Sequence, residues 1–129
     1  MRILLFKLSK MVKKIDFIEI KEYQDKVVKS AEDRFILLAY FVGDYNTAYD
    51  LPDIISDLKQ VANGEKTFDE IRQHPQVLWS FGEGSGIFTC DKDTAYFESE
   101  HPDSEPSMEL PLQELIDILE RWKDFLGIK

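Results

Sequence analysis

The chain has 129 residues, of which 43% are hydrophobic, 12% aromatic and 32% charged, the composition of a folded globular protein rather than a disordered one. This length is typical of one domain with one core, so we expect a single domain over residues 1–129 that folds without a disulfide or a metal. Cys90 is the only cysteine, which excludes an internal disulfide and favours a reducing compartment.

Charge is distributed unevenly along this chain, whose net charge is −9. Residues 1–34 contain nine Lys or Arg and six Asp or Glu, whereas residues 35–129 contain seven and nineteen. Within residues 91–120 there are ten acids, and Lys92 is the single base. Such a surface repels phosphate backbones, so we expect no direct binding of nucleic acid. An ordinary solvated acidic surface that maintains solubility is an equally good interpretation.

Residues 1–10 carry a short apolar run that lacks the features of a targeting signal. Lys7 interrupts the run, and no small-x-small cleavage site follows it. Nowhere does an apolar stretch approach the roughly 20 residues that span a bilayer. We therefore expect a cytoplasmic protein without a membrane segment, and residues 1–10 can be interpreted as an extension that precedes a start at Met11.

The first elements in chain order are a strand and two segments that fit helices. Residues 13–21 alternate apolar and polar side chains, with a change of phase between Phe17 and Ile18 that indicates a bulge. Residues 22–33 are polar with three apolar residues at helical spacing, which favours a short amphipathic helix.

Residues 35–42 form a continuous apolar run that ends at Gly43 and fits either a buried strand or a helix. Ser30 with Asp33 has the spacing of a capping box, and Gly43 fits the position just past a helix end. These two signals favour the helix slightly, and periodicity leaves the choice open.

Two helices are predicted in the middle of the chain. Residues 51–62 carry an apolar stripe, with Pro52 in the first turn and Gly64 just after the end. Thr67 and Glu70 then form a capping box for a second, short helix that ends before the next proline.

In the last third of the chain the spacing of apolar residues first fits strands and then fits a helix. Residues 77–100 predict a three-stranded antiparallel meander, with glycine-rich residues 82–86 in its first turn. Residues 101–108 predict a loop, and residues 111–126 predict a helix with one apolar stripe that ends at Gly127. We therefore expect an α+β fold in which an antiparallel meander packs against several amphipathic helices in a single layer.

Candidate catalytic groups are few, and none has a motif around it. His74 and His101 both precede a proline in predicted loops, so solvated histidines are the better interpretation. The glycines of residues 82–86 lead into a strand rather than into a helix N-terminus, which favours a hairpin over a phosphate-binding loop. Cys90 has no neighbouring base and fits a buried core position.

Metal and cofactor sites are not predicted either. The chain has no His or Cys pair at the spacing of a zinc site. A calcium loop that began at Asp91 would need glycine at its sixth position, where this sequence has Tyr96. We expect no cofactor and no metal.

The acidic segment is the predicted partner-binding region. Its carboxylates lie beside aromatic and soft apolar residues, a combination that suits a partner rich in Lys and Arg, because charge steers the encounter and apolar contact holds it. The predicted binding residues are Asp91, Asp93, Tyr96, Glu98, Glu100, Asp103, Glu105 and Glu109. Glu114, Asp117 and Glu120 follow at a spacing of three, and we expect them on one exposed helix face.

The layout of the chain also resembles a known class of proteins. Residues 39–45 (Ala-Tyr-Phe-Val-Gly-Asp-Tyr) precede an acidic helix, and the C-terminal helix carries Trp122. In these features and in size the chain resembles the small acidic immunity proteins of bacterial toxin systems. The resemblance implies a cytosolic inhibitor of a toxin, often a nuclease, whose acids pair with the catalytic Lys or Arg of the toxin and exclude substrate.

Two functions of different classes therefore follow from the sequence. The first is a protein-binding module, not an enzyme, whose acidic face blocks a basic partner; the sequence leaves its oligomeric state open. The alternative is an enzyme or small-ligand domain that uses residues 82–86 with His74 or His101 as the acid–base group. One continuous acidic patch favours the first function, and a deep cleft around His74, Asp91 and the glycines favours the second.

Overall fold

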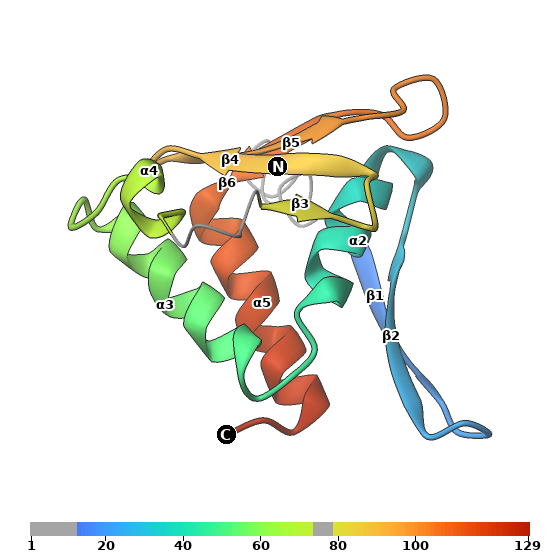
Figure 1. The fold of residues 1–129 in the computed structure, drawn as a ribbon. Helices are drawn as coiled ribbons and strands as arrows, with labels where there is room; N and C mark the ends of the chain where they lie inside the picture. The colour runs from blue at the N-terminus through green and yellow to red at the C-terminus, as the bar shows by residue number, and fades with distance from the viewer. Residues whose placement is uncertain (1–12, 74–78) are drawn as a thin grey trace, which may run out of the picture.

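The computed structural model describes residues 13–73 and 79–129, which form an α+β fold with two antiparallel sheets. Figure 1 shows the arrangement of the elements. In chain order the elements are β1 (Ile15–Ile20), β2 (Asp25–Ser30), the 3-10 helix η1 (Asp33–Phe35), α2 (Ile36–Asp44), α3 (Asp50–Ala62), α4 (Phe68–Ile71), β3 (Ser80–Phe81), β4 (Gly86–Cys90), β5 (Thr94–Ser99), β6 (Met108–Pro111) and α5 (Leu112–Leu126).

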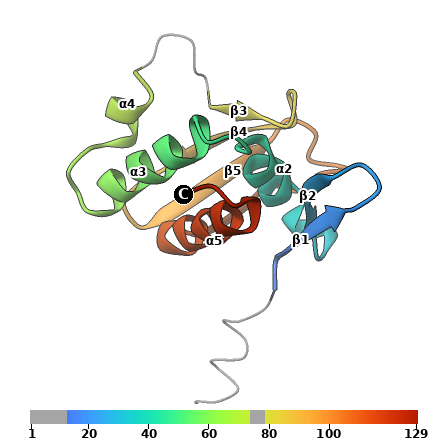
Figure 2. The same cartoon turned by 90° about the horizontal axis from the view of Figure 1, so that it is seen from below.

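The four-stranded sheet has the order β3-β4-β5-β6, and α2, α3 and α5 lie in one layer beneath it (Figure 1). The hairpin of β1 and β2 stands beside α2 and α5, outside the four-stranded sheet (Figure 2). The predicted meander and its single helical layer are therefore confirmed. Helices cover one face of the sheet, as expected for an antiparallel sheet in a two-layer fold.

The core lies between the sheet and the helical layer and is rich in aromatic rings. Phe88 on β4 and Phe97 on β5 both point toward α2, where the Phe41 ring lies 4.6 Å from Phe88 and 5.3 Å from Phe97, between centroids. Trp122 of α5 is 1% exposed, and its indole N–H donates to the Tyr45 carbonyl at 2.8 Å. The ring contacts fix α2 against the sheet, and the bond from Trp122 fixes α5 to the end of α2.

The N-terminal hairpin differs from the sequence prediction. The expected helix over residues 22–33 is wrong, because residues 25–30 form β2 and pair with β1 in an unbroken register from Ile15–Ser30 to Ile20–Asp25. The expected bulge between Phe17 and Ile18 is also wrong. The change of phase arises because β1 carries apolar residues on both faces. Gln24, with φ 52°, completes the tight turn that returns the chain.

The helical predictions in the rest of the chain are largely confirmed. The ambiguous run at residues 35–42 is a helix, α2, which is buried over most of its length and continues through Gly43 to Asp44. The capping box expected from Ser30 and Asp33 is not formed, since neither η1 nor α2 has a side-chain cap. The second predicted capping box is present: Thr67 and Glu70 bond reciprocally at the start of α4.

The C-terminal half adds one strand to the predicted meander. Residues 108–111 form β6, which pairs with β5 from Thr94–Pro111 to Phe97–Met108. The predicted loop at residues 101–108 therefore ends where β6 begins. α5 follows β6 directly and ends at Gly127, whose φ of 78° is the left-handed conformation that glycine adopts readily. His74, Pro75 and Val77 lie outside the described residues.

Candidate protein-binding surface

The four-stranded sheet presents one face to the helices and the other to solvent. Along β4 and β5 the side chains alternate, so that every second one is buried. On the second face no helix of the described residues is present (Figure 1). We define the outer sheet face by five of its exposed residues on β4, β5 and β6: Ile87, Thr89, Tyr96, Glu98 and Glu109.

Strand register brings the members of the outer sheet face together. Tyr96 lies between its cross-strand partners Thr89 and Glu109, and Glu98 pairs with Ile87 on β4. Side chains opposite each other on one face have Cβ atoms about 5 Å apart. Tyr96 is 37% exposed and Ile87 38%, so two large apolar side chains lie on this face among carboxylates.

A shallow hollow lies on this face between β5 and β6. Its volume is about 480 Å³, and its lining includes Tyr96, Glu98 and Glu109 together with Ser107 and Met108. Three of the eight predicted binding residues therefore share one concave surface. Two carboxylates beside a tyrosine side chain can accept a cationic side chain, which would gain ion pairs and contact with the ring.

Asp91 and Asp93 lie in the turn between β4 and β5, at one end of the outer sheet face. The Asp91 carboxylate accepts the backbone N–H groups of Asp93 and Thr94, both at 2.8 Å, and the hydroxyl of Tyr96 at 3.1 Å. Its pKa is lowered, first by the bonds from the two backbone N–H groups. The same carboxylate raises the pKa of Tyr96 by accepting a hydrogen bond from its hydroxyl, which stabilises the protonated form. Asp91 thus orients Tyr96.

The remaining predicted binding residues lie in the loop between β5 and β6. Glu100 follows the end of β5, and its N–H donates to the Ser85 carbonyl at 2.9 Å. Asp103 is exposed in the same loop. Glu105 instead interacts with the Tyr40 hydroxyl of α2, whose pKa is raised by partial burial and then by this carboxylate. Within this loop Glu105 therefore interacts with α2, whereas Glu100 and Asp103 are exposed to solvent.

The acids of α5 do not extend this surface. Glu114 pairs with Lys14 of the chain before β1, and Glu120 pairs with Lys59 of α3. Asp117 is exposed and accepts the Gln113 side-chain amide at 3.0 Å. The expectation of one exposed acidic face on this helix is wrong in part, because neighbouring lysines on either side engage the first and last of the three acids.

The glycine-rich residues 82–86 connect β3 to β4 in a hairpin, as predicted from the strand that follows them. Gly82 and Gly84 have φ values of 61° and 96°, and the Asp44 carboxylate accepts the Gly82 N–H at 2.8 Å. A carboxylate already bound to this loop would repel a phosphate. His101 is exposed at the start of the β5–β6 loop, and His74 lies outside the described residues.

Cys90 occupies the inner face of the sheet at 9% exposure, as expected for a core residue. Burial raises the pKa of its thiol to about 12, so the thiolate that a nucleophile requires is scarce at neutral pH. Within the described residues no group of three His, Cys, Asp or Glu could hold a metal ion. In the same part of the chain, no helix is both long and apolar enough to cross a membrane.

Comparisons with models of protein families, with curated proteins and with solved structures found no match to this chain. The sequence prediction missed Ile87 and Thr89, because it searched for acids and not for the strand that faces them. The alternation of β4 could have identified them. Successive side chains of a strand point to opposite faces, so if Phe88 and Cys90 are buried, Ile87 and Thr89 have to be exposed.

Proposed function

We propose that this chain is a protein-binding module of the toxin-neutralising, immunity type, and that its outer sheet face occupies a basic surface of its partner. The observation that carries the proposal is the face of the four-stranded sheet that no helix of the described residues covers, where Tyr96 and Ile87 lie among the carboxylates of Glu98 and Glu109. Large apolar side chains at the centre of a charged surface are typical of protein-binding sites.

The two kinds of side chain would contribute differently to binding. Carboxylates at the rim attract a basic partner over distance and raise the rate of association. Tyr96 would supply buried contact area, and its ring is already held by the bond from its hydroxyl to Asp91, so little conformational entropy is lost on binding. We expect Tyr96 to be the energetic centre and the acids around it to set specificity.

A basic surface that recognises acids is often one that binds the phosphates of nucleic acid. If the partner is a nuclease, Glu98 and Glu109 would pair with Lys or Arg residues that otherwise hold the substrate backbone. The module would then inhibit by occupying the site, without any turnover. Asp93, Glu100 and Asp103 at the two ends of the face would add to the steering field.

Affinity capture from the native host with mass spectrometry tests this proposal. The wild-type chain should retain a basic protein, and the double reversal Glu98→Lys/Glu109→Lys should not retain it. The products of neighbouring reading frames are the first candidates for purified binding measurements. Raising the salt concentration should weaken the captured complex, since exposed charges are screened.

A matched control reverses two acids that lie elsewhere. Asp53 on α3 and Asp117 on α5 are exposed and away from the sheet, so Asp53→Lys/Asp117→Lys changes the net charge by the same amount. This control should capture the partner as the wild type does. Equal loss in both variants would mean that net charge alone matters, and retention by the Glu98/Glu109 variant would contradict the proposed surface.

A further inference from the structure

A pocket that shares no residue with the outer sheet face lies where α3 meets the chain after α2, the end of α4 and the residue before β3. Its volume is about 310 Å³. Ile54, Ile71 and Trp79 form the apolar part of its lining, and Tyr45 adds a half-buried ring. Aliphatic and aromatic residues beside a few polar groups are typical of ligand pockets, and this volume is at the lower end of their range. The pocket therefore suits a small ligand with an apolar stem.

The polar part of this lining is acidic. Asp50 and Asp57 of α3 contribute to it, and none of the described lining residues is a Lys, Arg or His. A spacing of seven residues is about two helical turns, so the two carboxylates lie on one face of α3. Burial raises the pKa of the Tyr45 hydroxyl, and nearby carboxylates, those of Asp50 and Asp57 among them, raise it further. The pocket therefore has a negative potential.

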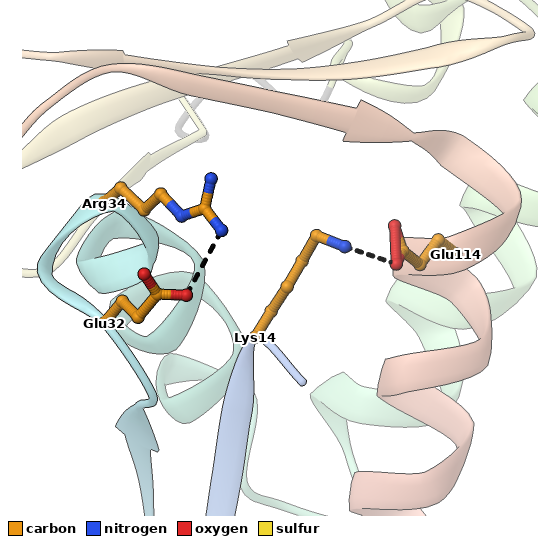
Figure 3. Close-up of polar contacts among 4 residues, drawn as sticks. All are labelled: Lys14, Glu32, Arg34 and Glu114. Atoms are coloured by element: carbon orange, nitrogen blue, oxygen red, sulfur yellow. Dashed lines mark hydrogen bonds and ion pairs between the residues drawn. The ribbon is translucent and has the colours of Figure 1, made fainter. Parts of the chain in front are cut away.

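A larger pocket, between β1 and α5, has no such excess of one charge. Its lining contains three bases and three acids: Lys13, Lys14, Arg121, Asp16, Glu114 and Asp124. The Lys14 ammonium bonds the Glu114 carboxylate at 2.7 Å, and beside it Arg34 pairs with Glu32 at 3.2 Å (Figure 3). Charges that neutralise each other in this way leave little potential for a ligand. The smaller pocket is therefore the better candidate for a charged ligand.

Hydrogen bonds hold the Asp50 carboxylate in place at the start of α3. Its Oδ1 atom accepts the Thr47 N–H at 3.1 Å and the Thr47 hydroxyl at 2.8 Å. Its second oxygen, Oδ2, accepts no hydrogen bond from the described residues. A carboxylate that is oriented through one oxygen is pre-organised to accept a cation at the other, because little conformational entropy is then lost on binding.

Trp79 gives an independent sign of a ligand. It is 7% exposed, and its ring lies 5.5 Å from that of Phe68 and 5.8 Å from that of Phe88, between centroids. Its indole N–H is buried and has no acceptor among the described residues, whereas the indole N–H of Trp122 bonds the Tyr45 carbonyl at 2.8 Å. A buried donor without an acceptor is rare because it costs free energy. An acceptor oxygen on a ligand in the pocket would satisfy it.

We propose that this pocket binds a small soluble molecule that carries a guanidinium group on an aliphatic stem together with an acceptor oxygen. The guanidinium would bond Asp50 and Asp57, because its planar fork matches carboxylates better than an ammonium does. The stem would pack on Ile54 and Ile71, and the oxygen would accept the Trp79 N–H. The inference is independent of the proposed function, since the pocket and the outer sheet face have no residue in common.

Titration of the indole N–H resonances in heteronuclear NMR spectra tests the proposal. The chain has two tryptophans, and Trp79→Phe identifies the resonance of Trp79. With Nα-acetyl-L-argininamide as the probe, this resonance should shift and reach saturation, with half-saturation at about 1 mM or below, as is usual for a ligand of this size. Nα-acetyl-L-citrullinamide, which has the same shape and no charge, should bind at least about tenfold more weakly. Equal affinities for the two probes, or a Trp79 resonance that does not move, would overturn the proposal.

Variants of the pocket acids test which side chains hold the probe. Asp50→Asn/Asp57→Asn keeps the shape of both side chains and removes their charges, so it should weaken probe binding at least about tenfold. Asp103→Asn/Asp117→Asn removes two exposed acids outside the pocket and should bind the probe as the wild type does. Equal affinities of the two variants, whether high or low, would overturn the proposal. The comparison of the two probes on the wild type decides the matter if the pocket variant does not fold.

Partner capture distinguishes a free ligand from a side chain of the partner. Because the proposed ligand is a free molecule, Asp50→Asn/Asp57→Asn should lose the probe and still capture the basic partner as the wild type does. Loss of capture by this variant would assign the guanidinium to an arginine of the partner and overturn the free ligand. The reversal of Glu98 and Glu109 should have the opposite effect, with capture lost and probe binding retained.

Discussion

The two faces of the four-stranded sheet are formed by neighbouring residues of the same strands and differ in everything that they contact. On the inner face Phe97 is 1% exposed and packs against the rings of Phe41 and Phe88. On the outer face Tyr96 and Glu98, its two neighbours in the chain, are exposed. Alternate residues of one strand can therefore serve different purposes, the inner ones stability and the outer ones binding. Substitutions on the two faces should then affect either stability or binding, but not both.

The largest effect is expected on the inner face, for Phe97→Ala. Removing this ring leaves a cavity among Phe41, Phe81 and Phe88, whose rings all contact it, and we expect the free energy of unfolding to fall by about 3–5 kcal/mol. Urea denaturation followed by tryptophan fluorescence measures the change. Phe97→Leu keeps most of the volume and should lose clearly less, while a loss below about 1 kcal/mol for the alanine variant would contradict a tightly packed inner face.

A smaller effect is expected for Gly86→Ala, at the start of β4 on the same inner face. An added Cβ would lie 2.7 Å from the Glu98 carbonyl oxygen and 2.7 Å from the Phe81 ring. Because the carbonyl belongs to a paired strand and cannot move freely, we expect a loss of about 1–3 kcal/mol in the same denaturation experiment. Unchanged stability would mean that β4 and β5 tolerate a shift in their spacing.

Substitutions on the outer face should hardly change the stability of the protein but should weaken partner binding. Glu98→Ala removes an exposed side chain next to Phe97 in the chain, so the free energy of unfolding should change by at most about 0.5 kcal/mol. Tyr96→Ala should reduce partner capture more than Glu98→Ala, because it removes the apolar centre of the face. If either substitution on the outer face unfolded the protein, the claim that only the inner face stabilises the fold would be wrong.

The smallest expected effect is the pH dependence of Asp91, at the end of the outer face. Its folded-state pKa is lowered, so the carboxylate stabilises the fold at pH values above its unfolded pKa of about 3.9, and this contribution disappears as the pH falls through the folded pKa. The stability difference between wild type and Asp91→Asn should therefore shrink from pH 6 toward pH 2. A constant difference in denaturation midpoint across that range would contradict the turn geometry.

Part of the candidate site could be predicted from the pattern of residues in the sequence. The meander and its turn at Asp91 follow from alternation and turn residues, so Tyr96 and Glu98 could be placed on one strand. The position of Glu109 opposite Tyr96 could not be derived, since β6 is four residues long and directly precedes a helix. The direction of Glu105 toward Tyr40 likewise depends on where α2 packs.

The sequence by itself determined α3, α4, α5 and the three strands of the meander, because their apolar periods, caps and turn residues act within a few positions of the chain. The tertiary structure decided the rest. Residues 25–30 have a pattern compatible with a helix and become a strand because β1 offers backbone partners. Glu114 and Glu120, alike in sequence to the acids of the sheet, are paired because Lys14 and Lys59 come from distant elements that fold against α5. Local patterns carry local structure, whereas pairing between distant segments depends on the packing of the whole chain.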